Sequence, residues 1–118
     1  MSKRILIIDD CGDIREMVSM LLQNDGCEVR QSECRDEALT ILGWLPDIVL
    51  LDYYMPGMTA EKFLHELLEL SPVKLPRIVL MTAASDADDQ ARRLGIPEVL
   101  RKPFNPSRVL LEISPCMN

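Results

Sequence analysis

The sequence has few of the residues that metal-binding and disulfide-rich small proteins need. Aromatic residues make up 4% of the 118 residues, and His65 is the one histidine. The four cysteines form no Cys-X-X-Cys pair, whereas a zinc site needs closely spaced thiolate or imidazole ligands. We therefore expect no zinc site, and we expect Cys11, Cys27, Cys34 and Cys116 to be reduced thiols.

The sequence also lacks a long apolar run and an excess of basic residues. The apolar N-terminal run stops at Asp9-Asp10, which leaves no room for a signal peptide, and no run reaches the length of a membrane span. The net charge is −6, so we expect no nucleic acid to bind this domain and no membrane as a partner. These absences predict a cytoplasmic protein.

No internal repeat, low-complexity tract or linker interrupts the chain. A length of 118 residues suits one domain, and a hydrophobic content of 47% with 27% charged residues is typical of a globular fold. We therefore expect one domain over residues 1–118.

Apolar runs alternate with segments of helical periodicity along the chain. The runs predict strands over 4–9, 27–31, 47–52, 77–82 and 96–101. Spacings of three and four residues predict helices over 14–22, 38–45, 59–68, 86–94 and 105–113. Five rounds of strand and helix indicate an α/β fold with a parallel sheet and helices on both faces. Pro97 falls inside the last strand, which is tolerable at a sheet edge.

Residues with capping side chains stand at several predicted helix ends. Asp13, Thr59 and Asn105 are the expected N-caps of the first, third and fifth helices, and Pro106 suits the first helical position. Gly95 is expected to close the fourth helix.

Four of the five predicted strands lead from an apolar run into polar residues at the carboxyl end. They are Asp9-Asp10, Asp52, Thr82 and Lys102, and the carboxyl ends of parallel strands share one edge, where ligands bind. Neighbouring carboxylates repel one another, and a hard divalent cation such as Mg²⁺ that binds between them would neutralise that repulsion. A lysine and a hydroxyl suit the oxygens of a phosphoryl group carried by a carboxylate. The residues therefore predict phosphoryl transfer onto an aspartate. Thr82 has a competing interpretation as the cap of the next helix.

Four short motifs in order resemble one family over nearly the whole chain. They are Ile7-Ile8-Asp9-Asp10, Leu50-Leu51-Asp52-Tyr53-Tyr54-Met55-Pro56-Gly57-Met58, Met81-Thr82-Ala83 and Lys102-Pro103-Phe104. The sequence resembles the receiver domains of two-component response regulators, of the stand-alone, chemotaxis-regulator-like kind. The resemblance implies a flavodoxin-like three-layer fold with five parallel strands in the order 2-1-3-4-5 and five helices.

The resemblance also implies a role for each residue of the motifs. Asp52 would be the phosphoacceptor, supplied by the phosphohistidine of a histidine kinase, by a histidine phosphotransfer protein or by an acyl phosphate. Asp9, Asp10, Asp52 and the Tyr54 carbonyl would hold Mg²⁺. Thr82 and Lys102 would contact the phosphoryl oxygens, and Pro103 would follow a cis peptide bond. The protein would assist its own phosphorylation and dephosphorylation without being an enzyme for a separate substrate.

Three positions depart from the family pattern. Val99 stands where the family often has an aromatic switch residue that moves together with Thr82. Tyr54 is bulky and Ala84 is small at positions that border the path of the hydrolytic water, so we expect an unusual dephosphorylation rate.

The resemblance leaves three functions to weigh. A stand-alone receiver would act through its fourth helix, fifth strand and fifth helix, where Arg92, Arg93 and Arg101 lie, on an unknown downstream protein, as a monomer or a phosphorylation-dependent dimer. The chain could also be the receiver of a larger regulator, or a degenerate receiver that binds partners without phosphorylation. A dehalogenase-type phosphatase needs a second aspartate where Tyr54 stands, and a flavodoxin needs a phosphate loop that Asp10-Cys11-Gly12-Asp13 does not provide.

Overall fold

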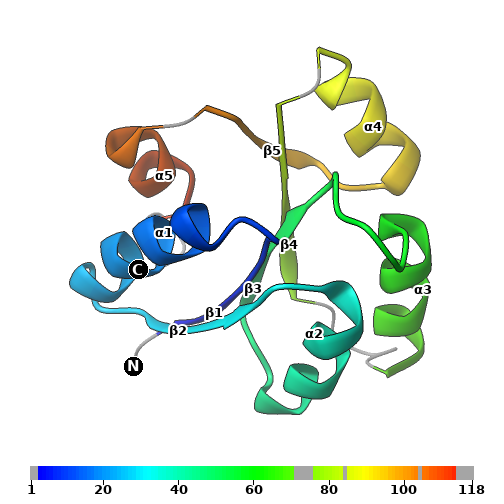
Figure 1. Ribbon diagram of the computed structural model, residues 1–118, viewed down its shortest axis with the longest axis horizontal. Helices are drawn as coiled ribbons and strands as arrows, with labels where there is room; N and C mark the ends of the chain where they lie inside the picture. The colour runs from blue at the N-terminus through cyan, green and yellow to red at the C-terminus, as the bar shows by residue number, and fades with distance from the viewer. Residues whose placement is uncertain (1–2, 71–75, 84, 104, 114–118) are drawn as a thin grey trace.

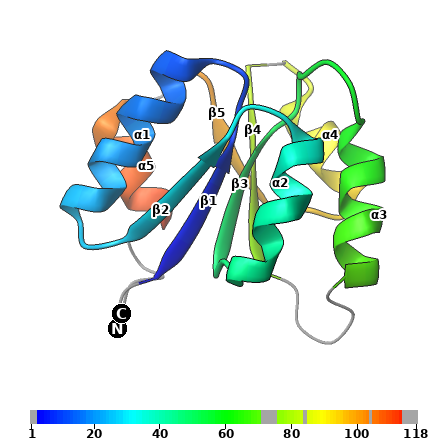
Figure 2. The same ribbon diagram turned by 60° about the horizontal axis from the view of Figure 1, so that its bottom comes forward.

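One parallel sheet of five strands lies between two layers of helices (Figures 1 and 2). The computed structural model describes residues 3–70, 76–83, 85–103 and 105–113. The strands are β1 (Arg4–Ile8), β2 (Glu28–Ser32), β3 (Ile48–Asp52), β4 (Arg77–Thr82) and β5 (Glu98–Arg101). The helices are α1 (Gly12–Asn24), α2 (Arg35–Ile41), α3 (Ala60–Leu70), α4 (Ala87–Leu94) and α5 (Pro106–Ile113), and a 3-10 turn, η1 (Leu42–Trp44), follows α2. The sheet order is β2-β1-β3-β4-β5, which confirms the predicted fold.

Each central strand is apolar on both faces because each face packs against helices. Ile5 and Ile7 of β1 share a buried cluster with Val18 of α1 and Val109 of α5. Leu6 and Ile8, which point to the opposite face, pack with residues of α2 and α3. Leu80 of β4 packs with Ala91 of α4 on the same side as α2 and α3 (Figure 2). The continuous apolar runs of the sequence are therefore the strands that two helical layers cover.

Of the three predicted N-caps, two are confirmed and one is wrong. Thr59 Oγ1 accepts a hydrogen bond of 3.1 Å from the backbone of Lys62, and Asn105 Oδ1 accepts one of 2.9 Å from the backbone of Arg108. Asp13, however, lies inside α1, and Cys11 occupies the N-cap position. The Cys11 amide donates to Asp9 Oδ1 at 2.9 Å. Asp9, directly after β1, thus fixes the N-cap residue, and α1 begins one residue before Asp13, at Gly12.

The last strand is shorter than predicted. It begins at Glu98, because the amide of Ile96 donates to the Ala91 carbonyl at the end of α4, where Gly95 has a left-handed φ of 73°. Pro97 therefore precedes the strand and costs no ladder hydrogen bond. Within the described residues, we find no helix with the length and apolar character that crossing a membrane would require.

Candidate functional site

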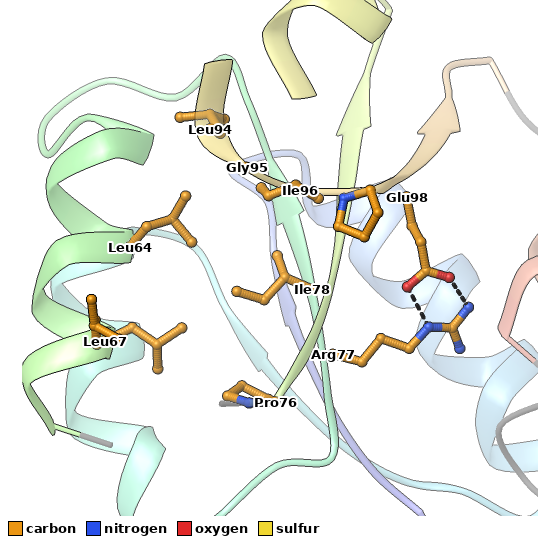
Figure 3. A pocket seen from close by; sticks show the side chains of 11 residues that line it. Leu64, Leu67, Pro76, Arg77, Ile78, Leu94, Gly95, Ile96 and Glu98 are labelled. Atoms are coloured by element: carbon orange, nitrogen blue, oxygen red, sulfur yellow. Dashed lines mark hydrogen bonds and ion pairs between the residues drawn. The ribbon is translucent and has the colours of Figure 1, made fainter. Parts of the chain in front are cut away.

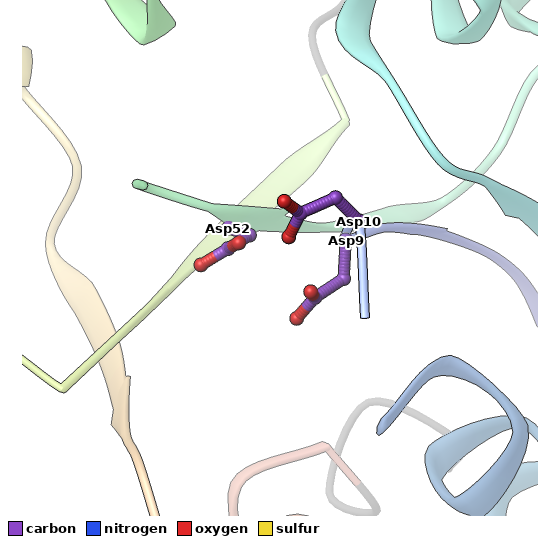
Figure 4. A group of neighbouring side chains, drawn as sticks. All are labelled: Asp9, Asp10 and Asp52. Carbon is purple, nitrogen blue, oxygen red and sulfur yellow. The ribbon is translucent and has the colours of Figure 1, made fainter. Parts of the chain in front are cut away.

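The sheet register brings the two buried aspartates together. Ile8 of β1 lies opposite Leu51 of β3, so the next residues, Asp9 and Asp52, stand side by side where both strands end. Asp10 follows at once on the loop to α1. Figure 4 shows the three carboxylates directed toward one another from these two strand ends.

The three carboxylates could hold a metal ion. One oxygen from each of Asp9, Asp10 and Asp52 lies within 4.8 Å of the others. Asp9 and Asp52 are buried, while Asp10 is exposed, so the group is enclosed on one side and open to solvent on the other. An all-oxygen ligand set with room for water suits a hard divalent cation.

Lys102 follows β5 at the same edge of the sheet and joins the two buried carboxylates from beyond β4. Its ammonium donates to Asp9 Oδ2 at 2.8 Å and to Asp52 Oδ1 at 3.1 Å. The backbone directs it there, because the Lys102 amide continues the β4–β5 ladder by donating to the Thr82 carbonyl at 2.9 Å. The peptide bond from Lys102 to Pro103 is cis, as the resemblance to receiver domains implies.

The pKa values of Asp52 and Lys102 are both raised, but for different reasons. Burial and the neighbouring charge of Asp9 raise the pKa of Asp52 from 3.8 to about 6, although Lys102 opposes the rise. Burial lowers the pKa of Lys102, but its hydrogen bond to Asp9 and the negative charges of Asp52 and Asp9 outweigh this and leave the pKa raised. Lys102 therefore stays protonated at neutral pH, beside the Asp52 carboxylate, which takes up a proton more easily than an ordinary aspartate in the absence of metal.

Thr82 and Tyr54 are both hydrogen-bonded to the side chain of Gln90, which the sequence does not single out. Thr82 is buried and donates a hydrogen bond of 3.2 Å to Gln90 of α4, whose amide nitrogen donates to the Tyr54 hydroxyl at 3.0 Å. The Tyr54 ring itself is exposed. The capping interpretation of Thr82 is wrong, because α4 begins at Ala87 with Asp86 as its N-cap residue.

Arg35 is the other residue that sequence reasoning missed. This guanidinium is 2% exposed, and it donates to the backbone carbonyls of Asp52 at 2.8 Å, of Tyr53 at 2.7 Å and of Met58. Burial lowers its pKa, and the charge of Asp52 opposes that effect. Arg35 thus holds both ends of the loop that follows the acceptor candidate.

The three arginines of the predicted output face are paired with acids at the N-cap and in the first turn of α4. Arg101 donates to Asp88 at 2.7 Å, Arg92 pairs with Asp89, and Arg93 lies 3.9 Å from Asp86. Val99 is partly buried and packs in the apolar cluster beneath α4. Ala84 lies outside the described residues, so its expected effect on hydrolysis stays a prediction.

A pocket of about 390 Å³ lies at the opposite edge of the sheet (Figure 3). Its walls include Leu64 and Leu67 of α3 and Ile78 of β4, and the ion pair of Arg77 and Glu98 stands where β4 and β5 begin. It is separated from Asp52 by the length of the strands and belongs to a different part of the molecule. His65, on the outer side of α3, is exposed and pairs with Glu69.

Comparison with known proteins identifies the arrangement. The family model described as response regulator receiver domain matches residues 5–114. The chain belongs to this family. The carboxylates, Thr82 and Lys102 thus lie in the polar edge of a receiver domain, and receiver domains of response regulators interact with histidine kinases.

Several relatives share this receiver domain as part of a longer chain. The phosphate regulon transcriptional regulatory protein PhoB of Escherichia coli is 33% identical over 121 residues, which cover 99% of this chain and 52% of that protein. The DNA-binding response regulator MtrA of Mycobacterium leprae is 33% identical over 116 residues, covering 96% of this chain and 50% of that protein. The chain thus spans about half the length of the curated relatives it matches.

Solved structures show the same fold. The chemotaxis response regulator CheY4 of Vibrio cholerae superimposes with a TM-score of 0.87 at 29% identity, covering 99% of this chain and 100% of that chain. The receiver domain of NtrX from Brucella abortus gives a TM-score of 0.81 at 29% identity, covering 94% of this chain and 95% of that chain. The predicted receiver architecture is confirmed by these matches.

Proposed function

We propose that Asp52 accepts a phosphoryl group from the phosphohistidine of a histidine kinase or a histidine phosphotransfer protein, or from an acyl phosphate. The observation that carries this proposal is the position of Asp52, a buried carboxylate that lies between two further carboxylates and the Lys102 ammonium. A purely structural aspartate would not need three charged neighbours at the carboxyl edge of the sheet.

The reaction moves one phosphoryl group between two nucleophiles. A carboxylate oxygen of Asp52 forms the new bond to phosphorus, and the P–N bond of phosphohistidine, or the P–O bond of an acyl phosphate, breaks. The electron pair stays with the leaving imidazole or carboxylate, and the product is an aspartyl phosphate. Lys102 can donate to a phosphoryl oxygen from its place beside Asp52, and the Thr82 hydroxyl is a second donor at the same edge.

The ligand set fits Mg²⁺. Asp9, Asp10, Asp52 and the backbone carbonyl of Tyr54 would hold the ion, and the three carboxylates have oxygens close enough to share one cation. When bound, Mg²⁺ would neutralise the negative charge that the carboxylates and the incoming phosphoryl group bring together. The same residues would assist hydrolysis of the aspartyl phosphate, so the protein acts on itself and not on a separate substrate.

The output would be a changed affinity of the surface formed by α4, β5 and α5 for a downstream protein. The pairs Arg101–Asp88 and Arg92–Asp89 lie on this surface and are exposed, so a partner can compete for either member. Because the chain spans about half of its relatives, an alternative is that it is the receiver of a longer regulator. We place it in the cytoplasm, where histidine kinases present their phosphohistidine, as a monomer or a phosphorylation-dependent dimer.

Intact-mass spectrometry tests the proposal. Wild-type protein with acetyl phosphate and Mg²⁺ should gain one phosphoryl group, which Asp52→Asn and omission of Mg²⁺ should abolish. Asp25→Asn, an exposed site far along the chain from the carboxylates, is the matched control and should be modified like the wild type. A wild-type protein that stays unmodified with acetyl phosphate and with kinase would instead be a degenerate receiver.

A further inference from the structure

Gln90 is a buried amide whose hydrogen bonds converge on the phosphoryl edge. It lies on α4, is 2% exposed and has hydrogen-bond partners on three different segments. Its oxygen accepts from the Thr82 hydroxyl at 3.2 Å, and its nitrogen donates to the Tyr54 hydroxyl at 3.0 Å and to Asp86 Oδ1 at 3.1 Å. One side chain thus connects the end of β4, the loop after Asp52 and the start of α4.

Asp86 determines which way this amide points. A carboxylate oxygen only accepts hydrogen bonds, so the Gln90 atom that faces Asp86 must be the nitrogen. The Gln90 oxygen is then the atom that faces Thr82. Since that oxygen is an acceptor, the Thr82 hydroxyl must supply the proton of the bond.

A threonine hydroxyl has one proton to donate. A phosphoryl group on Asp52 presents only acceptor oxygens, so Thr82 can contact it as a donor only after giving up its bond to Gln90. Building on the proposed function, we propose that Gln90 is a positioning residue that withholds the Thr82 proton from the phosphoryl group and so opposes phosphorylation. Phosphorylation then exchanges the Thr82–Gln90 hydrogen bond for a Thr82–phosphoryl one.

The exchange of the Thr82 hydrogen bond changes the contacts of Gln90 on α4. Once Thr82 turns away, the Gln90 oxygen loses its partner while its nitrogen still bonds Tyr54 and Asp86. The side chain of Val99 has no hydrogen-bonding atom, so it cannot compete for the Thr82 proton. Gln90 thus couples the state of Thr82 to the helix of the proposed output surface.

A double-mutant cycle of Gln90 and Thr82 tests the proposal. Gln90→Met keeps the side-chain volume and removes the acceptor, so the ratio of phosphorylated to unphosphorylated protein at a fixed, low acetyl phosphate concentration should rise about fivefold. Combined with Thr82→Val, which has no proton to release, the Gln90→Met change should leave that ratio unaltered. Gln23→Met, at an exposed position of α1, is the control and should behave like the wild type.

A surface variant tests the same point without touching the core. Asp86→Asn lets the amide of Gln90 reverse, because an asparagine can donate as well as accept, and part of the population then frees the Thr82 proton. We expect the phosphorylated ratio to rise about twofold. Asp89→Asn removes an equal charge from the first turn of α4 and should leave the ratio unchanged. The comparison of Asp86→Asn with Asp89→Asn tests the role of Gln90 even if Gln90→Met fails to fold or Thr82→Val takes up too little phosphate.

The outcomes separate the two proposals. An unchanged or lowered ratio in Gln90→Met, or an equal rise with and without the Thr82 hydroxyl, overturns the role of Gln90 while phosphorylation of Asp52 stands. If neither the wild type nor any variant is phosphorylated, the proposed function fails and the role of Gln90 falls with it. If Gln90→Met is phosphorylated and the wild type is not, that result would support both the phosphorylation of Asp52 and the role of Gln90.

Discussion

Arg35 donates a hydrogen bond of 2.8 Å to the backbone carbonyl of Asp52. The same buried guanidinium also bonds the carbonyls of Tyr53 and Met58, so it spans the loop that carries Tyr54. A buried charge is costly unless its donors find acceptors, and here backbone carbonyls accept from Nη1 and Nη2. The geometry of the acceptor loop therefore depends on one side chain of α2.

Replacing Arg35 by methionine should destabilise the protein and loosen the acceptor loop. Three carbonyls would lose their donor, and we expect a loss of about 3 kcal/mol or more in the free energy of unfolding, measured with urea. Phosphorylation of the folded fraction should slow as well, because the carbonyls of Asp52, Tyr53 and Met58, which fix the loop that carries Tyr54, are no longer held. Arg92→Met, at an exposed site of α4, should change neither quantity; equal effects of the two variants would refute this role of Arg35.

Replacing Lys102 by methionine should leave two buried carboxylates without their shared cation. Removal of one partner from a buried ion pair typically costs about 3–5 kcal/mol. The loss should be largest at neutral pH and smaller in acid, where protonation of Asp52 relieves the repulsion from Asp9. Lys62→Met on the exposed side of α3 is the control. A loss that does not depend on pH would show that Lys102 acts through packing and not through charge.

Asp52 should weaken the folded state at neutral pH in the absence of metal. Its pKa rises from 3.8 to about 6 on folding, so the folded protein binds more protons than the unfolded chain between these values. Each pH unit of that interval lowers the stability by about 1.4 kcal/mol, and above pH 6 the loss is complete. With EDTA present, Asp52→Asn should therefore be more stable than the wild type at pH 7 by about 2–3 kcal/mol, and the gap should close toward pH 4. Urea unfolding at several pH values measures it, and a gap that widens in acid would contradict the raised pKa.

Mg²⁺ should make the wild type more stable than Asp52→Asn, the reverse of the order expected without metal. A ligand that binds only the folded state stabilises it in proportion to the logarithm of its concentration, once this exceeds the dissociation constant. The melting temperature of the wild type should rise with Mg²⁺, whereas Asp10→Asn and Asp52→Asn should respond weakly because each removes one of the clustered carboxylates. Asp13→Asn, which changes an exposed acid of α1 outside the cluster, should respond like the wild type. An equal rise in all variants would place the ion elsewhere.

The strands and the polar edge were predictable for one physical reason. A strand that helices cover on both faces is apolar throughout, so its first polar residue marks where it ends, and parallel strands end at one edge. Asp9, Asp52, Thr82 and Lys102 were found in this way. Periodicity could not reveal Arg35 and Gln90, because charged and amide residues in a helix normally face water and their reach depends on tertiary packing. The capping pattern does not locate the start of α1, because the Cys11 amide at the N-cap position donates to Asp9, a residue outside the helix.

Mapping the phosphorylated residue tests the central claim most directly. Borohydride reduces an aspartyl phosphate to homoserine, so treatment after acetyl phosphate and Mg²⁺ would leave a permanent mark that peptide mass spectrometry can locate. The account predicts homoserine at position 52 and unmodified aspartate at positions 9 and 10. Homoserine at Asp9 or Asp10, or none in a protein that remains folded, would contradict it.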